Sequence, residues 1–110
     1  MDAEARAEAV AGLDPSEDAE LATLAELVTA DPSPLVRAEA ARQLGNEASL
    51  FSTMSLLGAL EDLDPYVVAA AIEALEFSAG ASIAPQLEPL LAHRSPAVRE
   101  AAASAIEFLE

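Results

Sequence analysis

Apolar residues recur along this chain at helical spacing, in runs separated by turns rich in Pro, Gly, Asp and Ser. Leu21, Leu24, Leu27 and Val28 follow the i, i+3, i+6, i+7 pattern of one helical face. Several runs start at a Pro, which fits the first turn of a helix because its missing N–H would be unpaired there. This pattern predicts seven helices, at residues 3–13, 17–30, 34–44, 48–61, 65–77, 81–92 and 96–109.

Some positions within these helices carry more specific expectations. Gly45 is expected to end helix 34–44 in the left-handed conformation, which Gly adopts at little cost. Gly58 costs about 1 kcal/mol relative to Ala inside a helix, so we expect it to let a neighbouring helix approach closely. Pro89 removes a backbone hydrogen bond, which predicts a bend or a late start in helix 81–92. The predicted apolar side of helix 48–61 holds Leu50, Phe51, Met54, Leu57 and Leu60.

The helices at 34–44, 65–77 and 96–109 are copies of one another at a period of 31 residues. Residues 6–9, Arg-Ala-Glu-Ala, recur as residues 37–40, so the first helix is a further copy. A fixed period with two helices per unit is typical of an α-solenoid. The aligned columns are Pro34, Pro65 and Pro96; Val36, Val67 and Val98; Ala40, Ala71 and Ala102; and Leu44, Leu75 and Ile106.

The sequence thus predicts an all-α protein of one domain, an α-solenoid of about 3.5 repeats of 31 residues. On each second helix, Val36, Ala40 and Leu44 and their copies form the buried stripe of an amphipathic helix. The small Ala at the centre of the stripe favours close packing. The expected units are residues 1–15 as a half repeat, then 16–46, 47–79 and 80–110.

Composition and charge narrow the range of partners. The chain has 20 Asp or Glu against five Arg and no Lys, a net charge of −15. Such a surface repels nucleic acids and anionic membranes, which bind through clustered Lys and Arg. It attracts a basic protein or peptide, although strong net charge also serves solubility alone, as in halophilic proteins. The acidic N-terminus does not resemble a signal peptide, and no stretch is typical of a membrane span, so we expect a cytoplasmic protein.

Candidate chemistry is sparse. The chain has one His, at position 93, and no Cys, which excludes disulfides and thiolate metal sites. Residues 61–64 bring three carboxylates together, but they lack the glycine and the distal Glu of a calcium loop, so a helix-capping turn is favoured. We therefore predict no enzymatic activity, no cofactor and no metal.

Three stretches resemble HEAT-type repeats of the short bacterial and archaeal kind that also occurs in phycobilin lyases: DPSPLVRAEAARQLG, DLDPYVVAAAIEALE and HRSPAVREAAASAIE. The resemblance implies a right-handed superhelix whose second helices line the inner surface. It also implies a ladder of loop Asp and helix Arg side chains, here Asp31 with Arg37, plus Arg6 and Arg99. Two residues depart from this pattern: Val68 replaces an Arg, and His93 replaces an Asp.

The face of the second helices opposite the buried stripe is the predicted site for binding protein. Tyr66 is the expected aromatic anchor, since Tyr is favoured at interfaces; alternatively it covers a neighbouring side chain on a merely solvated face. Its candidate residues are Leu35, Glu39, Arg42, Tyr66, Glu73, Glu76 and Glu100.

The resulting functional hypothesis is a non-catalytic scaffold that binds a basic protein or peptide. The alternative, which rests on the resemblance, is a chromophore-lyase-like subunit or an accessory of an enzyme complex. Phe77 and Phe108 are expected to cover the junctions to the following first helices. Phe108 and Leu109 then form an apolar C-terminal edge, which predicts self-association or a longer parent chain.

Overall fold

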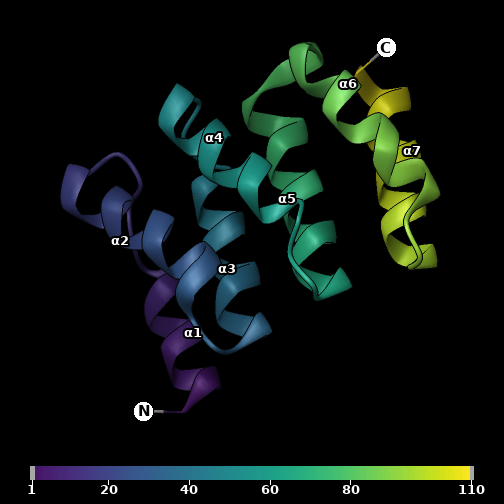
Figure 1. Ribbon diagram of the computed structural model, residues 1–110. Coiled ribbons are helices and arrows are strands. Elements are labelled where there is room, and N and C mark those ends of the chain that lie inside the picture. Colours follow the sequence, from purple (N-terminus) through teal and green to yellow (C-terminus); the bar gives the residue numbers. More distant parts are fainter. Residues whose placement is uncertain (1, 110) are drawn as a thin grey trace.

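The computed structural model describes residues 2–109, and regular structure within them is entirely helical. Helices α2, α4 and α6 are each followed by an antiparallel partner, α3, α5 and α7, while α1 stands at the N-terminal end (Figure 1). The pairs stack side by side into the all-α solenoid that the sequence predicts. The bounds are α1 Ala3–Ala11, α2 Asp18–Ala30, α3 Pro34–Leu44, α4 Leu50–Ala59, α5 Pro65–Ser78, α6 Ala84–Leu87 and α7 Pro96–Leu109.

The core is a continuous layer between the two rows of helices, and it follows the repeat columns. Val36, Ala40 and Leu44 have no exposed surface, and the same holds for Val67, Ala71 and Leu75 one period later. Each of α3, α5 and α7 begins at its Pro, as predicted. The buried stripe is thereby confirmed on α3 and α5; on α7, Val98 and Ala102 are buried and Ile106 is half-buried.

The two predictions about glycines in helices 34–44 and 48–61 are wrong. Gly45 ends α3 with φ −65°, in the right-handed region, so it is not a left-handed stop. Its missing side chain matters instead because a Cβ there would lie 2.7 Å from Cβ and 2.9 Å from Cα of Ala74 in α5. A Cβ at Gly58 would meet nothing within 4 Å, so no helix approaches it closely. The glycine that allows close packing is Gly45.

Helix α4 buries only part of the predicted apolar side, namely Leu60 and, partly, Leu57. Leu50, Phe51 and Met54 are exposed by 76%, 51% and 64%. The helix carries apolar residues on two stripes, and its neighbours α2, α3 and α5 pack against the other one. That buried stripe consists of Ser52, Leu56, Ala59 and Leu60, and the Ser52 hydroxyl has no hydrogen-bond partner among the described residues.

The segment expected as helix 81–92, with a bend or a late start because of Pro89, is broken into three short pieces. It consists of a 3₁₀ turn η1 at Gly80–Ile83, the single α-turn α6, and a second 3₁₀ turn η2 at Glu88–Ala92. Gly80 stops α5 with φ +71°, a conformation that suits Gly. The expectation for Phe77 is wrong, because its side chain is exposed by 80% and covers no junction as core. Phe108 is exposed by 66%, which agrees with the apolar edge expected at α7.

Candidate functional site

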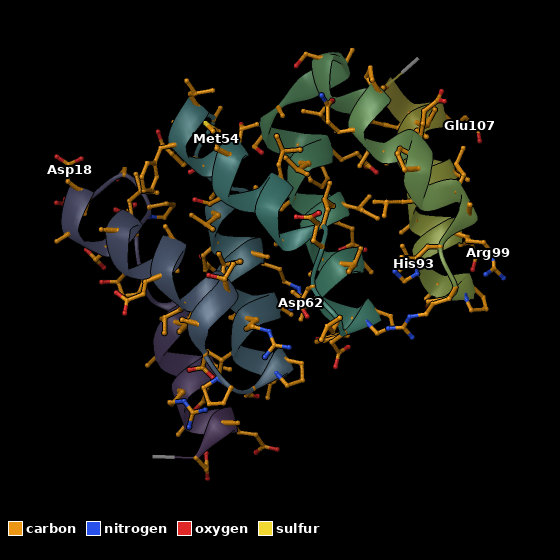
Figure 2. The ribbon with its side chains drawn as sticks, in the orientation of Figure 1. Asp18, Met54, Asp62, His93, Arg99 and Glu107 are labelled. Carbon is orange, nitrogen blue, oxygen red and sulfur yellow. The ribbon has the colours of Figure 1, made fainter. Side chains whose placement is uncertain are left out.

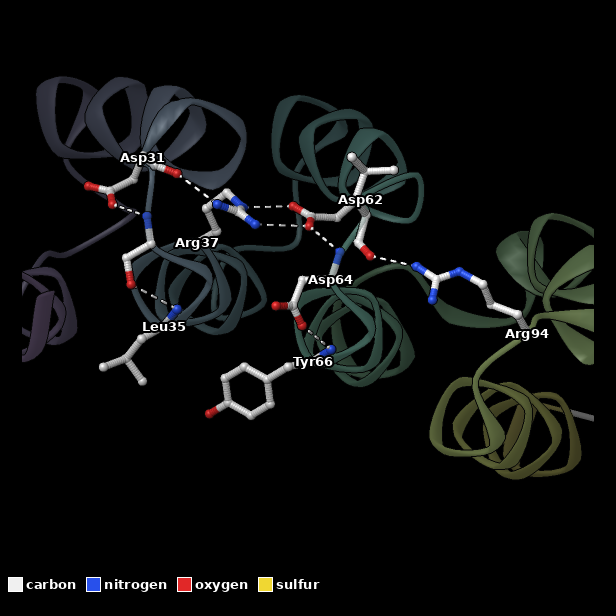
Figure 3. A network of polar contacts seen from close by, with 9 residues as sticks. Asp31, Leu35, Arg37, Asp62, Asp64, Tyr66 and Arg94 are labelled. Atoms are coloured by element: carbon white, nitrogen blue, oxygen red, sulfur yellow. Dashed lines mark hydrogen bonds and ion pairs between the residues drawn. The ribbon is translucent and has the colours of Figure 1, made fainter.

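An ion-pair ladder joins successive helix pairs at the loops that precede the second helices. Arg6 donates from Nε and Nη2 to the Asp31 carboxylate, at 3.2 and 3.0 Å. Arg37 donates in the same way to Asp62, at 2.9 and 3.2 Å (Figure 3). In both rungs the Arg lies 25 residues before its Asp, so each rung links one second helix to the next loop.

The expected ladder therefore exists, but the pairing of the Asp31 carboxylate with Arg37 is wrong. Arg37 donates from Nη1 to the backbone carbonyl of Asp31 at 2.9 Å, while its Nε and Nη2 donate to the Asp62 carboxylate. Each carboxylate also accepts a backbone N–H two residues ahead, from Ser33 or Asp64, both at 2.9 Å. The Arg6 guanidinium and this N–H lower the pKa of Asp31 against the opposing effect of burial.

The third rung is absent on both sides at once. Position 68 carries a fully buried Val, and position 93, 25 residues later as in the other rungs, carries His in place of Asp. His93 Nδ1 accepts the Ser95 N–H at 3.0 Å, so the turn bond survives without the charge pair. Arg94 instead crosses to the preceding loop and donates to the Leu63 carbonyl at 2.8 Å (Figure 3). Because Arg and Asp are replaced together, neither replacement strands the charged partner of a lost rung.

The third Arg of the column, Arg99, forms no ion pair within the described residues, so the expectation that it belongs to the ladder is wrong. It repeats only the carbonyl contact of Arg37. Its Nη1 donates to the His93 carbonyl at 2.7 Å, as that of Arg37 does to the Asp31 carbonyl. Figure 2 labels Arg99 and His93, which lie near the start of α7. The ladder is a structural device, because its groups satisfy one another between layers of the fold.

The face predicted to bind protein lies on the other side of the second helices, where a groove runs between each neighbouring pair. The groove between α1 and α3 has a volume of about 360 Å³ and an Ala floor at Ala7 and Ala11. Its polar walls are entirely acidic, formed by Glu4, Glu8 and Glu39.

The groove between α5 and α7 is built in the same way. It has a volume of about 420 Å³, and alanines of both helices line it. Its charged residues are again all acidic, namely Glu73, Glu76 and Glu100. Burial and the neighbouring Glu73 carboxylate raise the pKa of Glu76, which shows that negative charge is crowded in this groove.

The middle groove, between α3 and α5, is mixed in character. Arg42, Glu73 and the exposed ring of Phe77 line a volume of about 210 Å³. Arg42 is already engaged: its Nη2 donates to the Tyr66 hydroxyl at 2.9 Å, and its guanidinium lies 5.2 Å from that ring centroid. It also forms an ion pair with Glu39 at 3.8 Å.

The predicted binding residues thus fall on one face but in three separate grooves. Leu35 and Glu39 line the first, Arg42 the second, and Glu76 and Glu100 the third. Glu73 borders the second and third grooves, and Tyr66 is held by Arg42.

Sequence reasoning missed three contributors, Glu4, Glu8 and Phe77. The two Glu residues could have been found by carrying the repeat register back to the first helix. Phe77 was assigned to the core because its spacing to Phe108 looked structural.

Comparison with protein families decides the identity of the fold. A family model described as HEAT repeats matches residues 53–110. The chain belongs to the HEAT-repeat family. Comparison with curated proteins and with solved structures gave no match. HEAT repeats generally act as scaffolds for protein interactions and are typically non-catalytic.

Two further observations concern the described part of this HEAT-repeat protein. None of the helices in residues 2–109 is long and apolar enough to cross a membrane. Over the same residues, no cluster of three or more His, Asp or Glu side chains is placed to hold a metal ion.

Proposed function

We propose that the chain binds a basic segment of another protein along the outer grooves of its second helices. We call this surface the acidic face; it consists of Glu4, Glu8, Glu39, Glu73, Glu76 and Glu100. One observation carries the proposal: the two outer grooves have only carboxylates as charged residues, and alanines line their floors. A Lys or Arg stem packs on such a floor while its charged head reaches the carboxylates at the rim.

The closeness of the Glu73 and Glu76 carboxylates also favours a basic ligand. The raised pKa of Glu76 reflects burial and repulsion from Glu73, a cost that a bound cation relieves. Arg42 does not compete for this role, because Tyr66 and Glu39 already hold its guanidinium. The long-range attraction of a chain with net charge −15 also speeds encounter with a basic partner.

The arrangement of the grooves defines the ligand further. Packed helices lie about 8–10 Å apart, so the two outer grooves are about 20 Å apart. An extended peptide covers this distance in about six residues. The preferred ligand therefore carries two basic clusters about six residues apart, with an apolar residue between them to meet Phe77 in the middle groove.

The test uses a labelled peptide with two Arg-Lys pairs separated by six residues, with a central Leu. Fluorescence anisotropy is expected to show binding that weakens with NaCl. The double variant Glu73→Lys/Glu100→Lys should weaken it at least tenfold, about 1.4 kcal/mol or more. A peptide with the pairs two residues apart should bind more weakly than the spaced peptide.

A matched control reverses the same number of charges away from the grooves. Glu26 on α2 and Glu88 in η2 are exposed and line none of the three grooves. If Glu26→Lys/Glu88→Lys weakens binding as much as the groove variant, the attraction is only that of the net charge. Binding that ignores salt would likewise refute the acidic face as the site.

A further inference from the structure

A second surface, at the N-terminal end of the solenoid, is an apolar cavity of about 240 Å³ between α1 and α2. Ala9, Val10 and Leu13 form one wall, and Thr23 and Leu27 form the other. Val36, at the start of α3, also lines it. The Arg6–Asp31 rung closes its polar side, and both of its groups are already paired. We call this cavity the N-terminal seat.

The repeat register shows what such a space holds elsewhere in the molecule. One period along, Ala9 and Leu13 correspond to Ala40 and Leu44, which have no exposed surface. Ala9 itself is exposed and Leu13 is only half-buried. The difference arises because α2 packs against both α3 and α4 and covers the later position.

The α2 wall of the seat gives the same result. The last turn of α4 is one residue shorter than that of α2, because the Asp62 N–H donates to the Ala59 carbonyl and the Asp31 N–H to the Leu27 carbonyl. The first helices therefore align at an offset of 32 residues. At this offset the buried Leu24 and Val28 of α2 correspond to Leu56 and Leu60, and Leu27 corresponds to Ala59. Ala59 is 1% exposed, whereas Leu27 is only partly buried. At both walls, then, the described chain leaves uncovered the apolar positions that a helix covers in the next repeat.

Charge next to the seat indicates what kind of helix fits it. The turn between α1 and α2 and the first turn of α2 carry Asp14, Glu17, Asp18 and Glu20. The Glu20 carboxylate folds over this turn and accepts the Asp14 N–H at 3.1 Å. A second copy of the chain would bring a further −15 to this acidic end, whereas a basic helix would be attracted.

We propose that the N-terminal seat binds an amphipathic, basic helix of a partner protein, which takes the place that α2 and α4 hold in the later repeats. The partner presents apolar side chains at i, i+3 and i+7 to the α1 and α2 walls. Its basic residues face the α1–α2 turn. This site is separate from the acidic face, so a partner engages either one alone or both together.

The probe is a labelled peptide with the sequence of residues 16–32, the segment that fills the equivalent position on α3. Its four acidic residues in the α2 region are changed by Glu17→Lys, Asp18→Lys, Glu20→Lys and Glu26→Lys, so that its apolar stripe is retained. Binding is measured by anisotropy at about 0.3 M NaCl, where long-range attraction is largely screened. Saturable binding of this peptide is expected.

Two protein variants block the seat from opposite walls. Ala9→Arg and Thr23→Arg alter exposed helix positions, so the fold tolerates both, and each should weaken peptide binding at least tenfold. Ala103→Arg adds the same charge at an exposed position of α7 and should change binding less than twofold. Circular dichroism verifies that all three variants are folded.

Location is tested directly because the chain has no cysteine. Thr23→Cys therefore gives one attachment point, and energy transfer from a dye there to a labelled peptide end reports binding at the seat. The acidic-face variant Glu73→Lys/Glu100→Lys should leave this signal within twofold of the wild-type value, which separates the two proposals.

Three results would overturn the proposal. The peptide could fail to bind, or bind equally well to Ala9→Arg and to the parent protein. Sedimentation could instead show a dimer of the protein alone that Ala9→Arg abolishes, in which case a second copy occupies the seat.

Discussion

The residues that replace the third rung, Val68 and His93, can be introduced at the second rung, in place of Arg37 and Asp62. Arg37→Val alone removes two hydrogen bonds to Asp62 and one to the Asp31 carbonyl. It leaves the Asp62 carboxylate, only 9% exposed, with the Asp64 N–H as its remaining hydrogen-bond donor among the described residues. The double variant Arg37→Val/Asp62→His reproduces the residues of the third junction, where the imidazole keeps the equivalent turn bond.

The expected magnitudes follow from what is left unpaired. Removal of one partner from a buried ion pair costs about 3–5 kcal/mol. Arg37 is 16% exposed, so we take the lower end, about 3 kcal/mol, for Arg37→Val. The double variant buries no lone charge, and replacement of a buried pair by an apolar residue is often near neutral, so its cost should be about 1 kcal/mol. Adding Asp62→His to Arg37→Val should therefore restore about 2 kcal/mol, whereas additive effects would destabilise the protein further.

Urea unfolding followed by circular dichroism at pH 8 measures all corners of the cycle, since an ordinary His is neutral there. The double variant should melt roughly 8 °C above the Arg37→Val single variant. Glu39→Gln is the control, because its ion pair with Arg42 is longer, at 3.8 Å, and more exposed, and should contribute less than about 0.5 kcal/mol. Strictly additive single and double effects would show that the ladder does not couple the repeats.

Three further measurements test other parts of the description. Gly45→Ala should destabilise by about 1–3 kcal/mol because its Cβ meets Ala74, whereas Gly58→Ala, in open space, should stabilise by about 0.5–1 kcal/mol; equal effects in urea unfolding would contradict the packing. The pKa of Glu76 is raised in the fold, so its contribution to stability is present at low pH and is lost as pH rises through that pKa. Glu76→Gln should therefore raise the melting temperature at pH 7 and not at pH 4, and a gain of the same size at both would refute this. Added NaCl should raise the melting temperature of a chain with net charge −15, and a flat or falling curve would refute repulsion as a destabilising factor.

The all-α solenoid could be predicted from the sequence because the residues that recur every 31 positions are the ones that pack in the core. Val36, Ala40 and Leu44 are buried for the same reason that they recur. The partner of Arg37 could not be read within one repeat, because both Asp31 and Asp62 are loop carboxylates at suitable positions. The joint replacement of Arg by Val68 and of Asp by His93 was the signal that these two columns pair across repeats.

Features without a repeat were harder to predict. Helix α4 has two apolar stripes, and only the positions of α2 and α5 decide which one is buried. A Gly has no side chain whose type could indicate a neighbour, so the sequence does not show that a helix approaches Gly45 and not Gly58. On the candidate site, the register of the acidic positions was predictable, but the division into three grooves depends on how the helices are spaced.

The broken helix before α7 has a consequence for how the molecule unfolds. The last pair combines two 3₁₀ turns around a single α-turn with a junction that lacks a charged rung. In a linear array, each pair is stabilised mainly by its nearest neighbour. Fraying therefore starts at the C-terminal pair, and amide protons of α7 should exchange with solvent faster than those of α3 and α5. The free energy of local unfolding should therefore be highest in the middle helix pairs and lowest in the C-terminal pair.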